Sequence, residues 1–206
     1  MRTPKQSEAV FGQFGKKWKA FARFNTALPH RPTEDLRNSG IGKFLLMVGM
    51  GASLEQNIET IKRYRDRIDI VVCDKGFGTL LSHGIRADMV FICDCNVSYR
   101  KWIAPYIDQT EGVKLIATTY ANPRWMKRWK GERYYFVNQD AIGSERLFAP
   151  LLGKDARIIP AGSNVSNEMV VFFNGADMHQ NINWAGYERY FLVGYDYSWQ
   201  LGSNYY

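Results

Sequence analysis

Cysteine and histidine are scarce in this chain, which has three of each among its 206 residues. The cysteines, Cys73, Cys93 and Cys95, form no CxxC pair, and the histidines lie far apart along the sequence. Disulfide frameworks and zinc sites both need such residues at characteristic spacings, so neither is expected. The sequence also has no GxSxG elbow and no adjacent cysteine and histidine, so it predicts no nucleophilic triad.

Long apolar runs are missing as well. Runs such as residues 44–48 are far shorter than the about 20 residues that a transmembrane helix requires. Residues 1–8 are charged and no apolar stretch comes after them, which is not the pattern of a secretory signal. We therefore expect a cytoplasmic protein with no transmembrane segment, and its 46% of hydrophobic residues can build the core of one domain.

Acidic residues are fewer than basic ones, 20 against 27, which gives a formal net charge of +7. Such an excess favours an anionic partner, and charge alone does not choose among a nucleotide, a nucleic acid, a sugar phosphate and a membrane face. Basic and aromatic residues alternate through residues 11–24, where Phe14, Trp18 and Phe21 recur at helical spacing. We expect a helix that packs its aromatic rings on the domain, with a membrane-facing helix as the alternative.

The chain divides by composition near residue 40. Residues 1–40 form a basic and aromatic N-terminal extension, and the prolines within residues 27–32 break any helix before the remainder of the chain begins. Residues 41–206 alternate apolar runs with helical patterns, which predicts right-handed crossovers. The predicted fold is therefore α/β and Rossmann-like, a mostly parallel sheet with helices on both faces. The predicted strands are residues 44–48, 69–73, 89–93, 113–117, 134–137 and 190–193, and helices are expected after Ser53 and at residues 76–83 and 165–173.

Small, acidic or hydroxyl-bearing residues come directly after nearly every predicted strand, and ligands of α/β sheets bind beyond the carboxyl ends of the strands. The turn at residues 49–53 is the phosphate candidate, because Gly49 and Gly51 permit a close approach and the helix after it offers free amides. It lacks the lysine of a Walker loop and the third glycine of GxGxxG. At this point a glycine turn without a ligand explains the pattern equally well.

Two aspartates, Asp74 and Asp94, end neighbouring predicted strands. Carboxylates that converge on one crevice suit Mg²⁺, which takes oxygen ligands and bridges to substrate phosphates. The alternative is that each carboxylate only accepts backbone hydrogen bonds in a turn. Residues 162–167 precede a predicted helix, so Gly162, Ser163 and Asn164 indicate either a second anion or ribose site or a simple N-cap.

Four segments, in order, resemble the MptE-like proteins, a family that joins archaeal 6-hydroxymethyl-7,8-dihydropterin pyrophosphokinases with the Maf flagellin glycosyltransferases. Residues 48–54 resemble its GxGPSL turn, with alanine in place of proline. Residues 73–94 are similar to its stretch of aspartate, helix, Gly-Ile-x-x-Asp, strand and aspartate, which thiamine pyrophosphokinases also carry in comparable form. Residues 161–166 resemble its Gly-x-Ser-Val segment with one extra residue, and residues 192–199 resemble the Gly-x-Asp-x-Ser-Trp strand end of bacterial members.

The resemblance covers residues 43–199 and implies a Rossmann-like domain that uses ATP or a nucleotide sugar, with Mg²⁺ as a candidate cofactor. It implies nucleotide-binding, metal-binding and catalytic roles. These fall on Gly49, Gly51, Ala52, Ser53, Asp74, Gly162, Ser163 and Asn164 for the nucleotide, on Asp74 and Asp94 for the metal, and on Asp94 and Asp196 for catalysis, with Asp196 near the acceptor.

The reaction stays open between pyrophosphoryl transfer from ATP to a pterin-like acceptor and glycosyl transfer from a nucleotide sugar to a small molecule or glycan. Glycosyltransferase members are usually longer, so a missing C-terminal acceptor portion also stays open. The alternative from another class is a non-catalytic module that binds an anionic polymer or a membrane surface through residues 16–23 and 124–130. No recognised nucleic-acid module is visible, so nucleic acid is not the expected partner.

Overall fold

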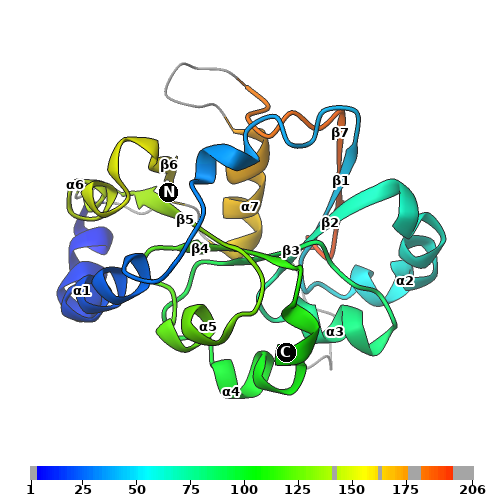
Figure 1. Cartoon of the computed structure of the whole chain (residues 1–206), viewed down its shortest axis with the longest axis horizontal. Coiled ribbons are helices and arrows are strands. Elements are labelled where there is room, and N and C mark those ends of the chain that lie inside the picture. The colour runs from blue at the N-terminus through cyan, green and yellow to red at the C-terminus, as the bar shows by residue number, and fades with distance from the viewer. Residues whose placement is uncertain (1–3, 141–142, 162–163, 176–181, 197–206) are drawn as a thin grey trace.

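A seven-stranded parallel sheet in the order β6-β5-β4-β3-β2-β1-β7 forms the centre of the computed structural model (Figure 1). The structure describes residues 4–140, 143–161, 164–175 and 182–196. The strands are β1 (Phe44–Val48), β2 (Ile68–Cys73), β3 (Met89–Ile92), β4 (Lys114–Thr118), β5 (Arg133–Gln139), β6 (Arg157–Pro160) and β7 (Arg189–Val193). The helices are α1 (Pro4–Thr26), α2 (Ser53–Tyr64), α3 (Gly76–Ser82), α4 (Tyr99–Trp102), α5 (Pro123–Arg128), α6 (Glu145–Phe148) and α7 (Val165–Asn174), with 3-10 turns η1 (Thr33–Leu36), η2 (Arg65–Arg67), η3 (Ala104–Thr110), η4 (Ala149–Leu151) and η5 (Gly153–Asp155).

The strand order explains why the helices divide unequally between the two faces of the sheet. Strands β1 to β6 advance in one direction, so right-handed crossovers place the connecting helices on one face. The chain then returns past β1 to form β7, and this return places α7 on the other face, where the sheet curls around it (Figure 1). The predicted α/β fold with a parallel sheet and helices on both faces is confirmed.

Alternation along β1 shows how the sequence builds both layers. Leu46 and Val48 lie in the core that includes α2, α3 and α5, whereas Leu45 and Met47 lie in the core under α7. A strand covered on both faces has no polar side, which is why β1 is a continuous apolar run. All six predicted strands are present within a residue or two of their expected bounds. Strand β6 was not predicted, because it ends at Pro160, a residue that a sheet tolerates at an edge strand such as this one.

Helix α1 packs its aromatic rings on the domain, as the first interpretation of this segment predicts. Trp18 stacks on Tyr120, the ring centroids lying 4.6 Å apart. The side-chain amide of Asn25 donates hydrogen bonds to the backbone oxygens of Thr119 at 2.8 Å and Ala121 at 2.9 Å. The N-terminal segment is thus tied to the loop after β4. Among the described residues, no helix has the length and apolar character needed to cross a membrane.

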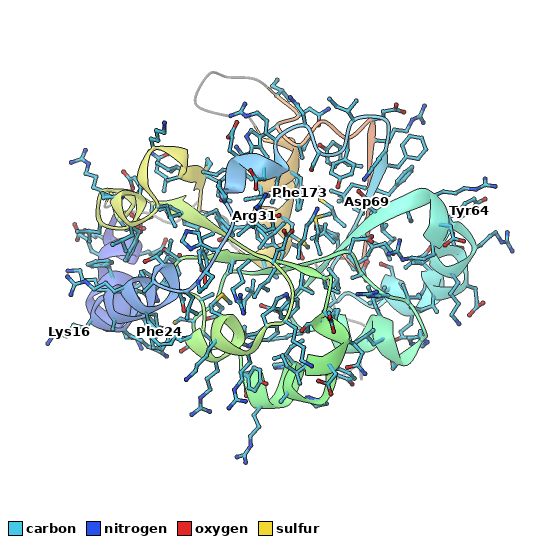
Figure 2. The ribbon with its side chains drawn as sticks, viewed as in Figure 1. Lys16, Phe24, Arg31, Tyr64, Asp69 and Phe173 are labelled. Atoms are coloured by element: carbon cyan, nitrogen blue, oxygen red, sulfur yellow. The ribbon has the colours of Figure 1, made fainter. Side chains whose placement is uncertain are left out.

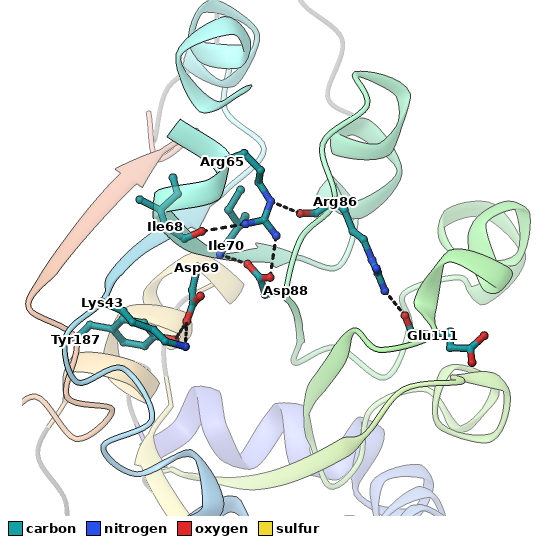
Figure 3. Close-up of polar contacts among 9 residues, drawn as sticks. All are labelled: Lys43, Arg65, Ile68, Asp69, Ile70, Arg86, Asp88, Glu111 and Tyr187. Atoms are coloured by element: carbon teal, nitrogen blue, oxygen red, sulfur yellow. Dashed lines mark hydrogen bonds and ion pairs between the residues drawn. The ribbon is translucent and has the colours of Figure 1, made fainter. Parts of the chain in front are cut away.

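Ion pairs tie together the amino ends of the central strands (Figure 3). Arg65 contacts Asp88 at 2.7 Å, which joins the turn before β2 to the residue before β3. Asp69 in β2 lies 3.3 Å from the Lys43 ammonium and accepts a hydrogen bond from the Tyr187 hydroxyl at 3.0 Å. The amino ends of β1, β2 and β3 are thus held together by paired charges.

Candidate active site

The glycine turn after β1 lies against the residues directly beyond β7. The N–H of Gly49 donates to the Val193 oxygen at 2.8 Å, and the N–H of Gly51 donates to the Gly194 oxygen at 2.8 Å. A Cβ atom at Gly49 would lie 2.4 Å from that same Gly194 oxygen, which is too close for any side chain. Both glycines are therefore required by the close approach of the two backbones. This structural requirement holds whether or not the turn also binds a phosphate.

The carboxylate of Asp196 occupies the N-terminus of α2. Its Oδ2 accepts the N–H of Ser53 at 2.7 Å, and its Oδ1 accepts the Ser53 hydroxyl, whose oxygen in turn accepts the N–H of Gly194 at 3.0 Å. Ala52 precedes the helix and contributes no side-chain cap. An anion at a helix N-terminus satisfies free amides and the helix dipole, so Asp196 takes the position that a phosphate would favour. The structure thus brings the predicted turn and Asp196 together.

Asp74 is a buried carboxyl group at the carboxyl end of β2. Its side chain is 4% exposed, and its Oδ1 accepts a hydrogen bond from the N–H of Lys75 at 2.7 Å. Burial, with a smaller contribution from the charge of Asp94, raises the pKa of Asp74 to about 7, while the N–H and the charge of Lys75 lower it. A carboxyl group with this pKa can take up or release a proton near neutral pH, as a general base requires.

Asp94 lies just after β3 and is exposed, in contrast to Asp74. Its Oδ1 accepts the N–H of Asn96 at 2.7 Å, so both aspartates accept a backbone hydrogen bond, as the turn interpretation predicts. The other carboxylate oxygens are the candidate metal ligands. Within the part of the chain that the structure describes, no group of three or more His, Cys, Asp or Glu residues is placed to hold a metal. Mg²⁺ in proteins is usually held by one or two carboxylates together with water and substrate phosphates. The carboxylates of Asp74 and Asp94 fit this pattern.

Helix α7 directs its N-terminus at the same edge. The side chain of Asn164 accepts the N–H of Asn167 at 2.9 Å, so Asn164 is the N-cap of the helix. A Cβ atom at Gly49 would lie 3.1 Å from the Ser166 hydroxyl, which places the first turn of α7 beside the glycine turn. Gly162 and Ser163, predicted to bind the nucleotide, lie outside the described residues.

A buried polar cluster at the same edge has no counterpart among the predicted site residues. The amide nitrogen of Asn138 donates to the Tyr120 hydroxyl at 3.1 Å and to Glu168 Oε2 at 3.1 Å. Burial is the main cause that holds the pKa of Cys93 well above its ordinary value, and the charge and hydrogen bond of Glu168 raise this pKa as well. One signal for this cluster exists in the sequence, because Asn138 directly follows the apolar run at residues 134–137 and Glu168 directly precedes the run at residues 169–173.

Two atoms of this region are buried without a hydrogen bond among the described residues, namely Asn138 Oδ1 and Thr119 Oγ1. Leaving a buried polar atom unpaired costs about 1 to 3 kcal/mol, and native proteins keep few of them. Both atoms lie at the carboxyl ends of β4 and β5, the edge that also holds Asp74 and the glycine turn. The carboxyl edge therefore holds one amide oxygen and one hydroxyl that have no hydrogen bond among the described residues.

A known protein family matches most of this chain. The family described as 6-hydroxymethylpterin diphosphokinase MptE-like matches residues 20–201. An uncharacterized protein of Treponema pallidum (strain Nichols) is 30% identical over 94 residues, which are 46% of this chain and 44% of that protein.

Among solved structures, the Maf glycosyltransferase of Magnetospirillum magneticum AMB-1 superposes with a TM-score of 0.64 at 18% identity, over 94% of this chain and 31% of that one. At this identity the likeness shows a shared fold, and the chain spans less than half the length of either relative. The family match covers most of the chain and includes every predicted site residue. The chain belongs to the MptE-like family.

Proposed function

We propose that this chain is a nucleotide-dependent transferase, and that glycosyl transfer from a nucleotide sugar is the reaction its geometry supports best. The observation that carries the proposal is the Asp74 carboxyl group, buried at the carboxyl edge with a pKa raised to about 7. A base with this pKa suits removal of a proton from a hydroxyl acceptor at neutral pH. The match to the MptE-like family and the Maf glycosyltransferase neighbour support the same class of reaction.

The donor would lie across the carboxyl ends of β1 to β5, between the glycine turn and the first turn of α7. The N-terminus of α7 at Val165 favours negative charge at the diphosphate. Asp196 already caps α2, so its role in the proposal is to hold the turn in shape. The unpaired Oδ1 of Asn138 would accept a hydrogen bond from a donor group of the ligand, such as a hydroxyl or an amino group.

In the proposed step, Asp74 accepts the proton of the acceptor hydroxyl while that oxygen bonds to the anomeric carbon of the sugar. The bond from the anomeric carbon to the phosphate oxygen breaks, and the nucleotide leaves with the electron pair. The positive end of α7 would stabilise the charge on the leaving phosphate. In this proposal the exposed Asp94 would contact the acceptor or a phosphate-bound cation.

The second candidate is pyrophosphoryl transfer from ATP, and the specific observation in its favour is the shared edge of Asp74 and Asp94. Each carboxylate has one oxygen that accepts a backbone N–H and a second oxygen that is a candidate ligand for Mg²⁺. When bound, Mg²⁺ would neutralise the transferring phosphates. This reaction requires both carboxylates, whereas glycosyl transfer requires Asp74 above all.

Calorimetric titration of the whole chain with UDP-, GDP- and CMP-linked sugars and with ATP, each with Mg²⁺ and with a chelator, tests the proposal. Sugar-nucleotide binding that survives the chelator, with slow donor hydrolysis by water, is expected. Asp74→Asn should keep binding and lose at least about a hundredfold in hydrolysis, since general-base catalysis contributes about 10² to 10⁴. The exposed Asp66→Asn is the matched control and should change neither quantity.

The two candidate reactions give different results in this experiment. ATP binding that requires Mg²⁺ and weakens in both Asp74→Asn and Asp94→Asn would establish the pyrophosphoryl reaction in place of glycosyl transfer. If none of the nucleotides binds under either condition, the nucleotide-dependent function itself is wrong.

A further inference from the structure

Two basic segments that are about a hundred residues apart in sequence meet in the fold, because α1 packs against α5. On α1, the side chains that pack inward include Trp18 and Ala22, while a stripe at spacings of three and four residues faces solvent. On α5, Trp125 and Met126 are buried and the basic residues are exposed. We define the basic face as the exposed cations of both helices, Lys16, Lys19, Arg23, Arg124, Lys127 and Arg128.

The cations of the basic face have no carboxylate partner among the described residues. Glu8 is the sole acidic residue of α1, and α5 contains none. By contrast, Lys130, two residues beyond the end of α5, pairs with Asp108 at 2.6 Å. Like charges that share one surface repel one another, so a cluster of six cations without carboxylate partners in the described chain is an electrostatic footprint for an anionic partner.

Apolar side chains border the basic face. Phe24 on α1 is 43% exposed, and Figure 2 shows Phe24 and Lys16 on the same helix at the rim of the molecule. Helix α6 and turn η4 pack against α1 and contribute Leu147, which is 47% exposed, and Leu151, which is 38% exposed. Cations beside exposed apolar side chains are typical of proteins that bind at a membrane surface, where the cations contact headgroups and the apolar groups reach the acyl chains.

We propose that the basic face, with Phe24, Leu147 and Leu151 at its border, binds the surface of a membrane that contains anionic lipids. The cations would contact lipid phosphates, and the apolar side chains would enter the boundary below the headgroups. Helix α1 contacts the loops after β3 and β4, so the basic face lies beside the carboxyl edge of the sheet. None of its six cations has a role in the proposed transfer reaction, so this inference does not depend on that activity.

Nucleic acid fits the same charges less well, because the rings of α1 are occupied. Single-stranded nucleic acid needs exposed aromatic faces on which bases stack. Trp18 is sandwiched instead, stacking on Tyr120 at 4.6 Å and on Phe14 at 6.1 Å, with Phe11 edge-on at 6.1 Å. The exposed ring on this helix is that of Phe24, which alone supplies one contact and no stacking platform.

Helix α1 is also fixed in place, which makes the binding peripheral. The Lys17 ammonium donates to the Asn96 side chain at 2.6 Å, and the Trp18 indole donates to the sulfur of Cys95 at 3.3 Å. An amphipathic helix that inserts in a membrane must expose its apolar face, and here that face is packed on the domain. The expected attachment is therefore electrostatic, reversible and sensitive to salt.

Co-sedimentation of the full chain with vesicles tests the proposal. Vesicles that mix phosphatidylcholine with phosphatidylglycerol should bind the chain, and phosphatidylcholine vesicles should not. The triple variant Lys16→Glu, Lys19→Glu and Arg23→Glu should weaken binding at least about tenfold, and so should Arg124→Glu, Lys127→Glu and Arg128→Glu, because each variant reverses three of the charges that attract the anionic surface. Phe24→Ala should lower the binding that remains at high salt.

The matched control is a triple variant of equal charge on a different surface, Arg63→Glu, Arg67→Glu and Arg189→Glu, all of them exposed. It should bind anionic vesicles almost as the unaltered chain does, and circular dichroism should show that all three triple variants are folded. An equal loss in the control would mean that net charge alone acts, which overturns the proposal. Single-stranded RNA bound through the same six cations, with no binding to vesicles, would also overturn it.

Discussion

The two edges of the parallel sheet differ in how their charged and polar groups are paired. At the amino edge, Arg65 pairs with Asp88 and Lys43 with Asp69, so charged groups are matched and partly in contact with water (Figure 3). At the carboxyl edge, Asp74 is buried with a raised pKa, and Asn138 Oδ1 has no hydrogen bond among the described residues.

Matched charges at the amino edge stabilise the fold, while unmatched buried groups at the carboxyl edge cost stability. Proteins keep such costs mainly where a site needs them. The comparison therefore separates an edge of paired charges from the edge that we propose to be functional, and removal of a carboxylate charge at the two edges should differ in sign as well as in size.

The largest effect is expected at the glycine turn, because Gly49→Ala would place a Cβ atom 2.4 Å from the Gly194 backbone oxygen. Relief of this contact must move β7 away from β1, at a cost of about 3 kcal/mol in the free energy of unfolding. Urea denaturation measures it. Gly12→Ala is the control, since a Cβ atom there meets nothing within 4 Å and alanine favours the helix. A loss below about 1 kcal/mol at Gly49 would show that the turn and β7 are not in this close contact.

At the amino edge, Asp88→Ala should destabilise the chain by about 2 kcal/mol. The carboxylate of Asp88 contacts Arg65 at 2.7 Å and accepts the N–H of Ile70 at 2.7 Å, so alanine removes both interactions. Asp88→Asn can keep the bond to Ile70 and should lose less. Chemical denaturation of the two variants measures the difference. Equal losses would show that the bond to Ile70 contributes nothing, and no loss in Asp88→Asn would show that the ion pair contributes nothing.

At the carboxyl edge, Asp74→Asn should stabilise the protein above pH 7, by about 1 kcal/mol or more. The folded pKa of Asp74, about 7, lies above its ordinary value of 3.8, so the folded chain holds the proton more tightly between these values. Its contribution to stability is full below about pH 4 and is lost as the pH rises to about 7. Thermal unfolding from about pH 4 to about pH 8 should show this decline in the unaltered chain and not in the variant. A variant that is less stable than the unaltered chain at the alkaline end of this range would contradict the burial of the charge.

The smallest effect is expected for Lys43→Ala, about 0.5 kcal/mol. The pair that Lys43 forms with Asp69 is partly exposed, with 54% of the lysine side chain accessible, and Asp69 keeps its hydrogen bond from Tyr187. The loss should shrink further in high salt, because water and ions screen this pair. A salt-independent loss above about 1 kcal/mol would mean that the lysine acts through packing.

Much of the fold could be predicted from the sequence, because its strands are buried on both faces. The predicted strand at residues 44–48 coincides with β1, and the residues after β1, β2 and β3 do meet at one edge. Strand β6 was not predicted because its first and last residues are Arg157 and Pro160, which leave too short an apolar run between them. No local pattern could place β7 beside β1, since that neighbour depends on the return of the chain across the sheet.

For the candidate site, the sequence predicts which residues lie at one edge of the sheet, but it does not predict which of them contact one another. The bond between Ser53 and Asp196 joins residues 143 positions apart, and no local pattern indicates that a carboxylate caps α2. The bond between Asn138 and Glu168 likewise depends on how α7 packs under β5. Spacing identifies which residues reach an edge, whereas long-range packing decides which of them touch.

Amide hydrogen exchange with and without a bound nucleotide sugar most directly tests the claim that the carboxyl edge, and not the amino edge, binds the ligand. We expect slower exchange at residues 49–54 and 164–169 of the carboxyl edge when the nucleotide is bound. We expect no change at residues 65–70 and 86–88 of the amino edge, where the charges are already paired. Protection confined to the amino edge, or unchanged exchange at the glycine turn in the saturated complex, would contradict the assignment of the carboxyl edge as the functional one.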